Sequence, residues 1–496
     1  MHYRLTTPEA HRQYINIDCH LRDLAPGTTQ LELQLPAWRP GRYELQNFAK
    51  NIQRFAVYDQ NDRPLPFRKL TKDRWQVDTQ GATEVVVRYN YYAGVINAGS
   101  SYVDDKLLYV NFVNLCVYAE GRIDEPCTVA LDVPPDWTIA CGLTQPGLTR
   151  PGLTRPDQAR PGTLRAANFY ELVDCPLIAS PDLHEIRYAV GDVAFHVWLQ
   201  GGRHAFDAER IRRDFSRFSE AQIRLFGAFP ETNYHFLTIV LPTAYYHGVE
   251  HRNSTVLVLG PDDEGEGLYT DLLGVSSHEL FHTWNIIRIR PDELLPYDFT
   301  RENYFTTCFV AEGVTTYYGD LMLRRAGVFD DAAYLKELQV LFKRHFEVSG
   351  RAVQSLVESS WDLWLDGYDR GVPDRKVSVY HKGATVALIL DLHLRRKFGH
   401  ERSLNDVMRL LWERFGEPFI GYTLDDYRGI TEEIARESLA WYYDTCIFGN
   451  EPLEDLLNEY LAFVGLHLLT DESGGTLLLE LDDEAGRAER ARWLGE

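Results

Sequence analysis

The pentapeptide His278-Glu279-Leu280-Phe281-His282 constrains this chain more than any other segment. Residues four apart lie above one another on one helical face, so a helix through these positions lets both imidazoles converge on one point. Two neutral histidines at this spacing are typical zinc ligands, and the glutamate between them lies beside the metal without binding it. There Glu279 can act as general base on a water that the metal activates. The alternative is an ordinary buried helix whose histidines make satisfied hydrogen bonds.

A zinc site of this kind needs a third protein ligand and leaves the fourth position to water. Glu312 is the best candidate, because it falls in an apolar stretch predicted as helix from about residue 303 to 326, where an unpaired carboxylate is costly to bury. The alternative is a salt bridge from Glu312 to Arg324 or Arg325. The acidic segment 262–266 is a weaker candidate, since its glycine favours a solvated loop.

These segments resemble a known family. HELFHTWNIIRIRP, from His278, and YDFTRENYFTTCFVAEGVTTYY, from Tyr297, are similar to the glycyl aminopeptidases of metallopeptidase family sixty-one, which belong to the gluzincins. The zinc ligands of that clan are the two histidines of the HExxH pattern and a downstream glutamate. The resemblance therefore implies that His278, His282 and Glu312 hold one zinc ion per chain and that Glu279 is the general base.

Three further segments resemble the same family, in the right order. YHGVEHRNS at 246–254 is similar to the family's GGLEHRNS segment, with His247 in place of the first glycine and Val249 in place of leucine. SVYHKGA at 378–384 is similar to SYYTKGA, with Val379 in place of the first tyrosine. LPAWRPGRYELQNFAKNI at 35–52 is similar to the family's opening domain. Four separated matches make coincidence a poor explanation.

Glu250 lies between two apolar runs, 235–241 and 255–259, and the second of these is predicted as a buried strand. A carboxylate on a strand edge that faces the metal can pair with a substrate's free α-ammonium, which fixes the cut one residue from the N-terminus. The resemblance implies this role for Glu250 and a substrate contact for Gly248. The alternative is a surface glutamate paired with Arg252.

Tyr380 opens a predicted helix that runs to about residue 398. A phenol at this position can donate a hydrogen bond to the oxyanion of the tetrahedral intermediate, worth roughly 2.7–4 kcal/mol in the transition state. The resemblance supports this role, whereas simple aromatic packing is the alternative in a chain with 28 tyrosines. Asn285 and Asp320 are candidates to orient a metal ligand, or they are helix-surface residues.

Short alternating segments such as 31–35 and 84–89 predict an antiparallel β-sandwich up to about residue 185. The rest is mostly helical apart from the strand pair around Glu250, an α+β pattern typical of a thermolysin-like unit. We therefore expect an α+β multidomain chain with a β-sandwich domain at 1–185, a thermolysin-like, mainly helical zinc peptidase domain at 186–468 and an acidic tail at 469–496. A near-repeat, PGLTR at 146–150 and 151–155, predicts an expanded loop.

Many relatives carry a PDZ domain of roughly ninety residues after the catalytic part, and the segment after His467 is too short for one, although it can form a hairpin or a short helix. The net charge of −22 argues against nucleic acid and anionic membranes as partners. The N-terminus lacks the apolar core of a signal peptide, which predicts a cytoplasmic location. Seven scattered cysteines without a CxxC pair indicate reduced thiols.

The predicted function is a zinc-dependent aminopeptidase acting on peptides with a free N-terminus, for which the resemblance implies a preference for glycine or alanine. One alternative is a zinc endopeptidase with the same site, in which Glu250 does not reach the amine. The other is a non-catalytic peptide-binding protein with a vestigial zinc site. The sequence gives no indication of the oligomeric state.

Overall fold

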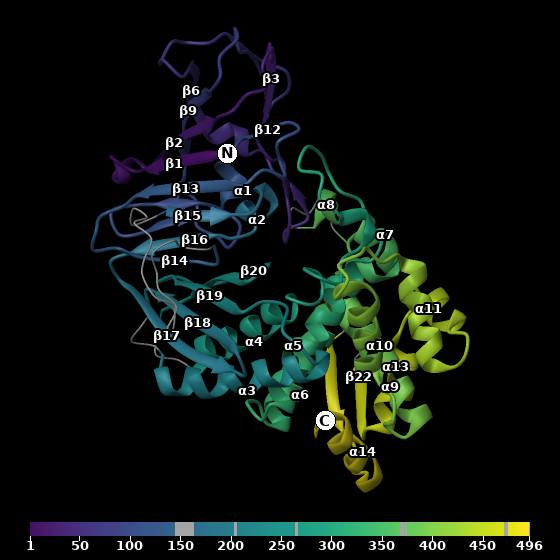
Figure 1. The fold of residues 1–496 in the computed structure, drawn as a ribbon. Coiled ribbons are helices and arrows are strands. Elements are labelled where there is room, and N and C mark those ends of the chain that lie inside the picture. Colours follow the sequence, from purple (N-terminus) through teal and green to yellow (C-terminus); the bar gives the residue numbers. More distant parts are fainter. Residues whose placement is uncertain are drawn as a thin grey trace.

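The computed structural model describes residues 1–143, 163–202, 206–262, 266–367, 372, 374–470 and 475–495 of the 496-residue chain. The near-repeat at 146–155 and residues 263–265 of the acidic segment lie outside the described residues. Stacked β-sheets occupy the N-terminal end of the molecule and helices occupy the other end, with a mixed sheet between them (Figure 1). The predicted α+β architecture, with β-sheets followed by a mainly helical part, is confirmed.

Alternation between buried and half-buried positions is clearest in β2 of the N-terminal sandwich. In β2 every second side chain is buried, because successive side chains of a strand point to opposite faces. A six-stranded sheet, in the order β15-β13-β1-β2-β9-β6, and a four-stranded sheet, β12-β3-β8-β7, share one apolar core. Their strands are β1 (His2–Thr6), β2 (Tyr14–Leu21), β3 (Gln30–Gln34), β6 (Ile52–Asp59), β7 (Phe67–Lys69), β8 (Arg74–Asp78), β9 (Val85–Tyr92), β12 (Tyr118–Ala119), β13 (Cys127–Asp132) and β15 (Thr163–Ala166).

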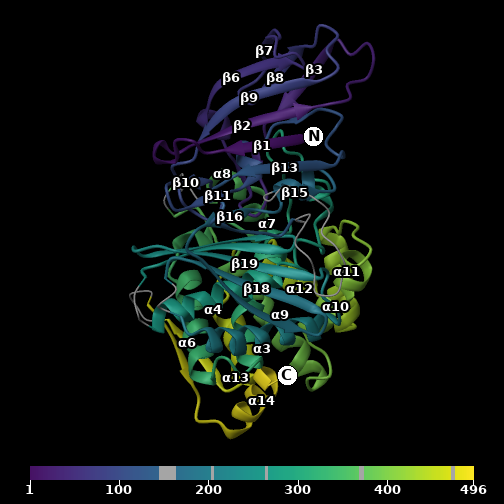
Figure 2. The same ribbon diagram turned by 60° about the vertical axis from the view of Figure 1, so that its left-hand side comes forward.

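A second four-stranded sheet, β10-β11-β16-β14, joins the sandwich to the helical part. Ile178 of this sheet shares an apolar cluster with Leu237 and Val256 of the mixed sheet, so the two sheets pack face to face (Figure 2). The strands of the joining sheet, and two short helices near it, are β10 (Tyr102–Val103), β11 (Leu108–Val110), β14 (Thr138–Cys141), β16 (Leu177–Ser180), α1 (Phe112–Leu115) and α2 (Phe169–Val173).

The mixed sheet has the order β17-β18-β19-β21-β20 and carries the predicted strand pair around Glu250. The helix α3 (Ala208–Phe226) connects the parallel strands β18 and β19, and β20 runs antiparallel to β21 at the sheet edge. Edge position leaves one side of β20 free of ladder partners within the sheet. The strands are β17 (Leu183–Val190), β18 (Val193–Gln200), β19 (Asn233–Val240), β20 (Tyr245–His251) and β21 (Ser254–Gly260).

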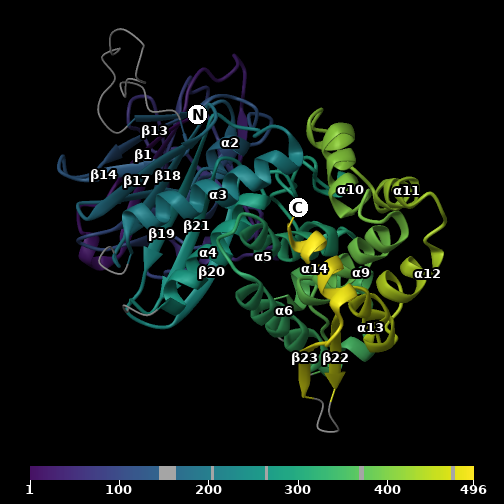
Figure 3. The same ribbon diagram turned by 90° about the horizontal axis from the view of Figure 1, so that it is seen from below.

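Helices cover the other face of the mixed sheet and share the largest apolar core with it (Figure 3). A π-helical turn, η4 (Phe309–Val314), leads directly into α5, so the helix predicted from about residue 303 begins later. No described helix combines the length and apolar character needed to span a membrane. The helices are α4 (Glu266–Phe281), α5 (Thr315–Arg325), α6 (Asp331–Phe346), α7 (Leu356–Trp361), α8 (Leu363–Asp366), α9 (His381–Phe398), α10 (Leu404–Leu411), α11 (Leu424–Ala435), α12 (Ala440–Tyr442) and α13 (Glu454–Phe463). Shorter 3₁₀ turns lie at Ala10–Arg12, Phe48–Asn51, Asp292–Leu294 and Ser349–Ala352, and π-helical turns at Trp412–Gly416 and Tyr443–Ile447.

The segment predicted as an acidic tail forms both a hairpin and a helix. Its elements are β22 (Leu466–Thr470), β23 (Thr476–Glu480) and α14 (Glu484–Gly495). Trp493 and Leu494 are fully buried, and Trp493 Nε1 donates a hydrogen bond of 2.9 Å to the hydroxyl of Tyr317 in α5. The end of the chain therefore packs into the helical core.

One hairpin of the N-terminal part reaches into the helical part. It consists of β4 (Trp38–Arg39) and β5 (Glu44–Leu45), joined by a turn in which Gly41 and Tyr43 have positive φ angles of 76° and 51°. Trp38 and Tyr43 belong to an apolar cluster whose other buried members come from the segments after α4, around η4 and before α9. These members are Ile286, Leu294, Phe305, Cys308, Ala311, Leu363 and Val379.

Candidate metal centre and substrate cleft

The two histidines of the HExxH pattern converge as predicted for a helical spacing. His278 lies in the last turn of α4, and the backbone N–H of His282 still donates to the His278 carbonyl at 3.3 Å. Their Nε2 atoms are 3.0 Å apart. His282 Nδ1 lies 2.6 Å from the backbone carbonyl oxygen of Asn285, which can only accept a hydrogen bond. Nδ1 therefore carries the proton, and the lone pair of His282 Nε2 is left for another partner.

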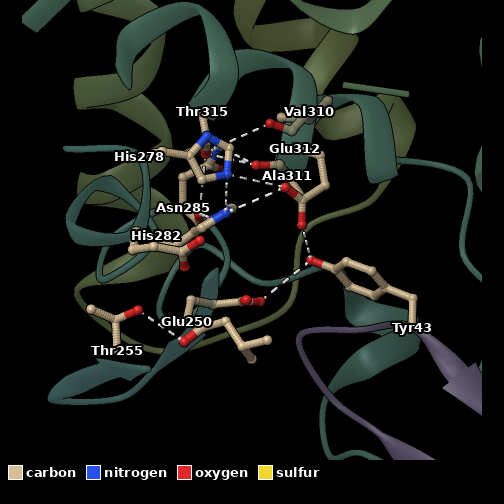
Figure 4. A network of polar contacts seen from close by, with 12 residues as sticks. Tyr43, Glu250, Thr255, His278, His282, Asn285, Val310, Ala311, Glu312 and Thr315 are labelled. Carbon is tan, nitrogen blue, oxygen red and sulfur yellow. Dashed lines mark hydrogen bonds and ion pairs between the residues drawn. The ribbon is translucent and has the colours of Figure 1, made fainter. Parts of the chain in front are cut away.

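Glu312 brings a carboxylate to the same point from the π-helical turn η4. Its Oε2 lies 3.3 Å from His282 Nε2 and 3.5 Å from His278 Nε2, and the three side chains are buried or half-buried (Figure 4). The predicted alternative, an ion pair with an arginine of α5, is not formed. Arg324 pairs with Asp331 at 2.6 Å, and Arg325 donates to Asn405 at 3.1 Å.

The three donor atoms fit a zinc ion. Zinc–nitrogen bonds of about 2.0–2.1 Å in a tetrahedron place neighbouring donors roughly 3.3 Å apart, close to the three separations found. Two imidazoles and one carboxylate are also a usual zinc ligand set. Burial opposes charge on His282, yet the carboxylates of Glu312, Glu250 and Glu279 raise its pKa to about 10, so this pocket attracts positive charge. A divalent cation would balance the negative charge of these carboxylates.

Asn285 fixes the geometry of two of these residues at once. Its backbone carbonyl accepts a hydrogen bond from His282 Nδ1, and its fully buried side-chain amide donates to three oxygen atoms around η4 (Figure 4). The acceptors are the carbonyls of Val310 and Ala311, at 2.9 and 3.3 Å, and the hydroxyl of Thr315, at 3.1 Å. A π-helical turn leaves such carbonyls poorly matched within the helix, and the amide satisfies them. Asp320, the other candidate for this role, is half-buried on the cavity wall, and among the described side chains it forms no hydrogen bond or ion pair with His278, His282 or Glu312.

Glu279 is buried against the edge strand β20. A Cβ atom on Gly248 would lie 2.2 Å from Glu279 Oε1, so only glycine allows the strand to pass this close to the carboxylate. Glu279 Oε2 has no hydrogen-bond partner among the described residues. Burial raises the pKa of Glu279 well above its usual range, although the nearby His282 acts in the opposite direction. The site thus offers one oxygen of a readily protonated carboxylate to a small polar molecule.

Glu250 is a buried carboxylate without a lysine or arginine partner among the described residues. It is 6% exposed, and within the described chain no lysine or arginine lies at ion-pair distance from it. Arg252, its predicted alternative partner, pairs instead with Glu231 at 2.7 Å and Glu171 at 3.3 Å. Oxygens of Glu250 and Glu279 and a ring nitrogen of His282 all lie within 4.8 Å of one another. Burial raises the pKa of Glu250 to about 7.

Tyr380 precedes α9, which crosses η4 at an unusually close point. A Cβ on Gly313 would lie 2.4 Å from the Cα of Gly383, and a Cβ on Gly383 would lie 2.7 Å from the Cα of Gly313. This glycine pair holds the turn that carries Glu312 against the first turn after Tyr380.

A cavity of about 510 Å³ unites these residues. Its wall includes all seven predicted site residues, and it extends beyond them along α4, α5 and α6, where carboxylates outnumber the one arginine. The predicted residues are His278, Glu279, His282, Glu312, Tyr380, Glu250 and Gly248, and the extension includes Asp271, Asp320, Glu337 and Arg344.

Two family models match the chain. The Peptidase M61 N-terminal domain matches residues 2–181, and M61 glycyl aminopeptidase matches residues 271–386. A crystal structure described as an aminopeptidase N family protein from Idiomarina loihiensis has 31% sequence identity and a TM-score of 0.86, over 95% of this chain and 79% of that chain. This chain belongs to the M61 glycyl aminopeptidase family. It is a metallopeptidase, and therefore a hydrolase.

The fold of this M61 peptidase is shared more widely. An M1 zinc metallopeptidase from Deinococcus radiodurans has a TM-score of 0.56 at 15% identity, over 91% of this chain and 94% of that chain. At that identity the likeness concerns the fold alone. A search of curated proteins gave no significant match.

Sequence reasoning did not single out three features of the site in this M61 peptidase. The hydroxyl of Tyr43 donates to Glu312 Oε1 at 2.6 Å, Gly41 lies against the Glu250 carboxylate, and a glycine pair brings η4 and α9 together. In the sequence these features correspond to the Pro-Gly pair before Tyr43, to Gly313 directly after Glu312, and to Gly383 three residues after Tyr380. Each of these is a common local pattern, so only the fold gives it a role.

Proposed function

We propose that this protein is a zinc-dependent aminopeptidase that removes one residue at a time from peptides with a free N-terminus, with glycine and alanine preferred. The observation that carries the proposal is the buried Glu250 carboxylate, which has no lysine or arginine partner among the described residues and faces the same cavity as the three-donor site. A buried carboxylate is costly unless a cation pairs with it. The α-ammonium of a substrate supplies that cation.

The spacing supports cleavage after the first residue. In an amino acid the amine nitrogen and the carbonyl carbon are two bonds apart, roughly 2.5 Å. Oxygens of Glu250 and Glu279 lie within 4.8 Å of a His282 ring nitrogen, so an amine held by Glu250 leaves its own carbonyl between the general base and the metal ligands. A second peptide bond along the chain would lie several ångströms further away.

His278, His282 and Glu312 would hold the zinc ion, which when bound supplies a Lewis acid that polarises the scissile carbonyl and acidifies a water. Glu279 takes a proton from the attacking water and later delivers it to the departing amine. Its raised pKa suits a carboxylate that must carry a proton between these two steps. Tyr380, on the wall of the cavity, donates a hydrogen bond to the developing oxyanion.

The β4–β5 hairpin favours an aminopeptidase over an endopeptidase. A Cβ on Gly41 would lie 2.9 Å from Glu250 Oε2 and 2.7 Å from Val249 Cγ1, so the hairpin backbone lies directly against the anchoring carboxylate. This wall occupies the side of Glu250 on which an endopeptidase would need to accommodate further residues. The preference for a small first residue rests on the description of the glycyl aminopeptidase family alone.

The test is hydrolysis of a panel of aminoacyl-aminocoumarin substrates by the full chain, with Glu279→Gln in parallel. We expect release from the glycine and alanine conjugates to be fastest and to fall by more than a thousandfold in the variant. A zinc-loaded enzyme that hydrolyses no aminoacyl-aminocoumarin but cleaves N-terminally blocked peptides would support the endopeptidase instead. Zinc binding without any turnover would point to a peptide-binding protein.

A further inference from the structure

The hydroxyl of Tyr43 lies between two carboxylates of the site. Tyr43 is 1% exposed, and its hydroxyl lies 2.6 Å from Glu312 Oε1 and 3.5 Å from Glu250 Oε1 (Figure 4). We propose that Tyr43 is a positioning residue of the metal centre, which turns Glu312 Oε2 toward the two histidines and keeps Glu250 beside it. This proposal rests on the proposed roles of Glu312 and Glu250.

The distances show where the single hydroxyl proton goes. At 2.6 Å the contact with Glu312 has the length of a charge-assisted O–H···O⁻ hydrogen bond, whereas 3.5 Å is at the limit for the contact with Glu250. Glu312 Oε1 is thus engaged, and Oε2 is the oxygen that faces the histidines at 3.3 and 3.5 Å. A free carboxylate can offer either oxygen to a metal, so the hydrogen bond selects one orientation.

The fold holds the Tyr43 ring firmly. The ring packs on Phe305, with centroids 5.5 Å apart, within the apolar cluster that also contains Trp38 and Ala311. Tyr43 has a φ of 51°, a backbone conformation that is uncommon for residues other than glycine. Packing that keeps a tyrosine in this conformation leaves its hydroxyl little freedom to move away from Glu312.

The hydrogen bond also links the two halves of the molecule. Tyr43 and Glu312 are 269 positions apart, and Tyr43 comes from a hairpin that leaves the N-terminal sandwich. The sandwich therefore contributes a group to the centre in the helical half. Metal affinity should then depend on a residue that contacts no metal.

The test compares Tyr43→Phe with Tyr89→Phe in the full chain. Tyr89 is a matched control because it is buried in the sandwich, and its hydroxyl donates a 2.6 Å hydrogen bond to the Leu115 carbonyl. Zinc affinity is measured by competition with a chromophoric chelator. We expect Tyr43→Phe to bind zinc about 10–100-fold more weakly, with turnover restored by excess zinc, and Tyr89→Phe to bind like wild type. Affinity of Tyr43→Phe within twofold of wild type would overturn the proposal.

A second variant covers a Tyr43→Phe protein that does not fold. Phe305→Leu keeps the Tyr43 hydroxyl but removes the aromatic ring on which the Tyr43 ring packs. We expect the zinc affinity of this variant to fall severalfold. Unchanged affinity in a folded Phe305→Leu protein would then overturn the proposal. Because zinc affinity is measured without substrate, weaker binding in Tyr43→Phe together with an inactive wild type would refute the proposed function and leave this inference standing.

Discussion

Gly383→Ala tests whether a close helix crossing builds the site. Gly383 is the glycine of the YHKGA segment, and its neighbour across the contact, Gly313, directly follows Glu312. A methyl group at position 383 would lie 2.7 Å from the Gly313 Cα and 3.1 Å from the Phe309 carbonyl oxygen. Both neighbours are backbone atoms, which cannot rotate away.

The magnitude follows from the overlap. Ordinary contact begins at about 3.4 Å, so the two segments must separate by about 0.7 Å. Overpacking of this kind costs about 1–3 kcal/mol, partly offset by the better helix propensity of alanine, up to about 1 kcal/mol. We expect a net loss of about 1–2 kcal/mol in the free energy of unfolding. Because Tyr380 lies one turn before Gly383, turnover should fall roughly 10–100-fold.

The assay is urea unfolding, with turnover of the best substrate in the panel measured in parallel. Gly429→Ala is the matched control, because Gly429 is exposed in the middle of α11 and an added Cβ would meet no atom within 4 Å. It should gain about 0.5–1 kcal/mol and keep full activity. If Gly383→Ala behaves like Gly429→Ala, the crossing does not position the site and the reasoning is wrong.

Three further outcomes are expected. Burial lowers the pKa of His345 to about 3. Between pH 6.5 and 3 the unfolded chain therefore takes up a proton that the folded chain does not, so the free energy of unfolding decreases as the pH is lowered through that range. Wild type should lose about 2 kcal/mol more than His345→Gln between pH 7 and pH 5 in denaturant titrations, and equal losses would contradict this account. Asn285→Ala should lower the free energy of unfolding by about 2–4 kcal/mol, because the Val310 carbonyl and the Thr315 hydroxyl lose this donor and the Ala311 carbonyl keeps only the Thr315 hydroxyl; it should also weaken zinc binding, and a stable variant with normal zinc affinity would argue against this. Chelation of zinc present at a thousand times its Kd should remove about 4 kcal/mol of stability, seen as a lower Tm by calorimetry, and an unchanged Tm would be inconsistent with a zinc site.

The sequence carried those features of the site that depend on local geometry. The spacing of His278 and His282 fixes a shared helical face, and the predicted cost of burying Glu312 in an apolar helix pointed to a positive partner. The alternation in segments 31–35 and 84–89 likewise predicts strands, and β3 and β9 lie there. These inferences need only a few consecutive residues.

Other features depend on packing between distant segments. The pattern around Tyr43 predicts a turn, and nothing near it indicates Glu312 as its partner 269 positions away. The glycines at 313 and 383 look like two separate helix weaknesses until the crossing is seen. The acidic C-terminal segment is predicted as a tail that can form a hairpin or a short helix, and Trp493 and Leu494 are the only large apolar residues of α14. Their burial against α5 is decided by the rest of the fold.

The most direct test of the account concerns the free amine. One peptide that begins with glycine is prepared with a free and with an acetylated N-terminus, and the products of wild type and Glu250→Gln are identified by mass spectrometry. We predict that wild type removes only the first residue from the free peptide, that acetylation slows cleavage at least a hundredfold, and that Glu250→Gln loses most of this discrimination. Equal cleavage of both peptides by wild type, or cuts at internal bonds, would contradict an aminopeptidase anchored by Glu250.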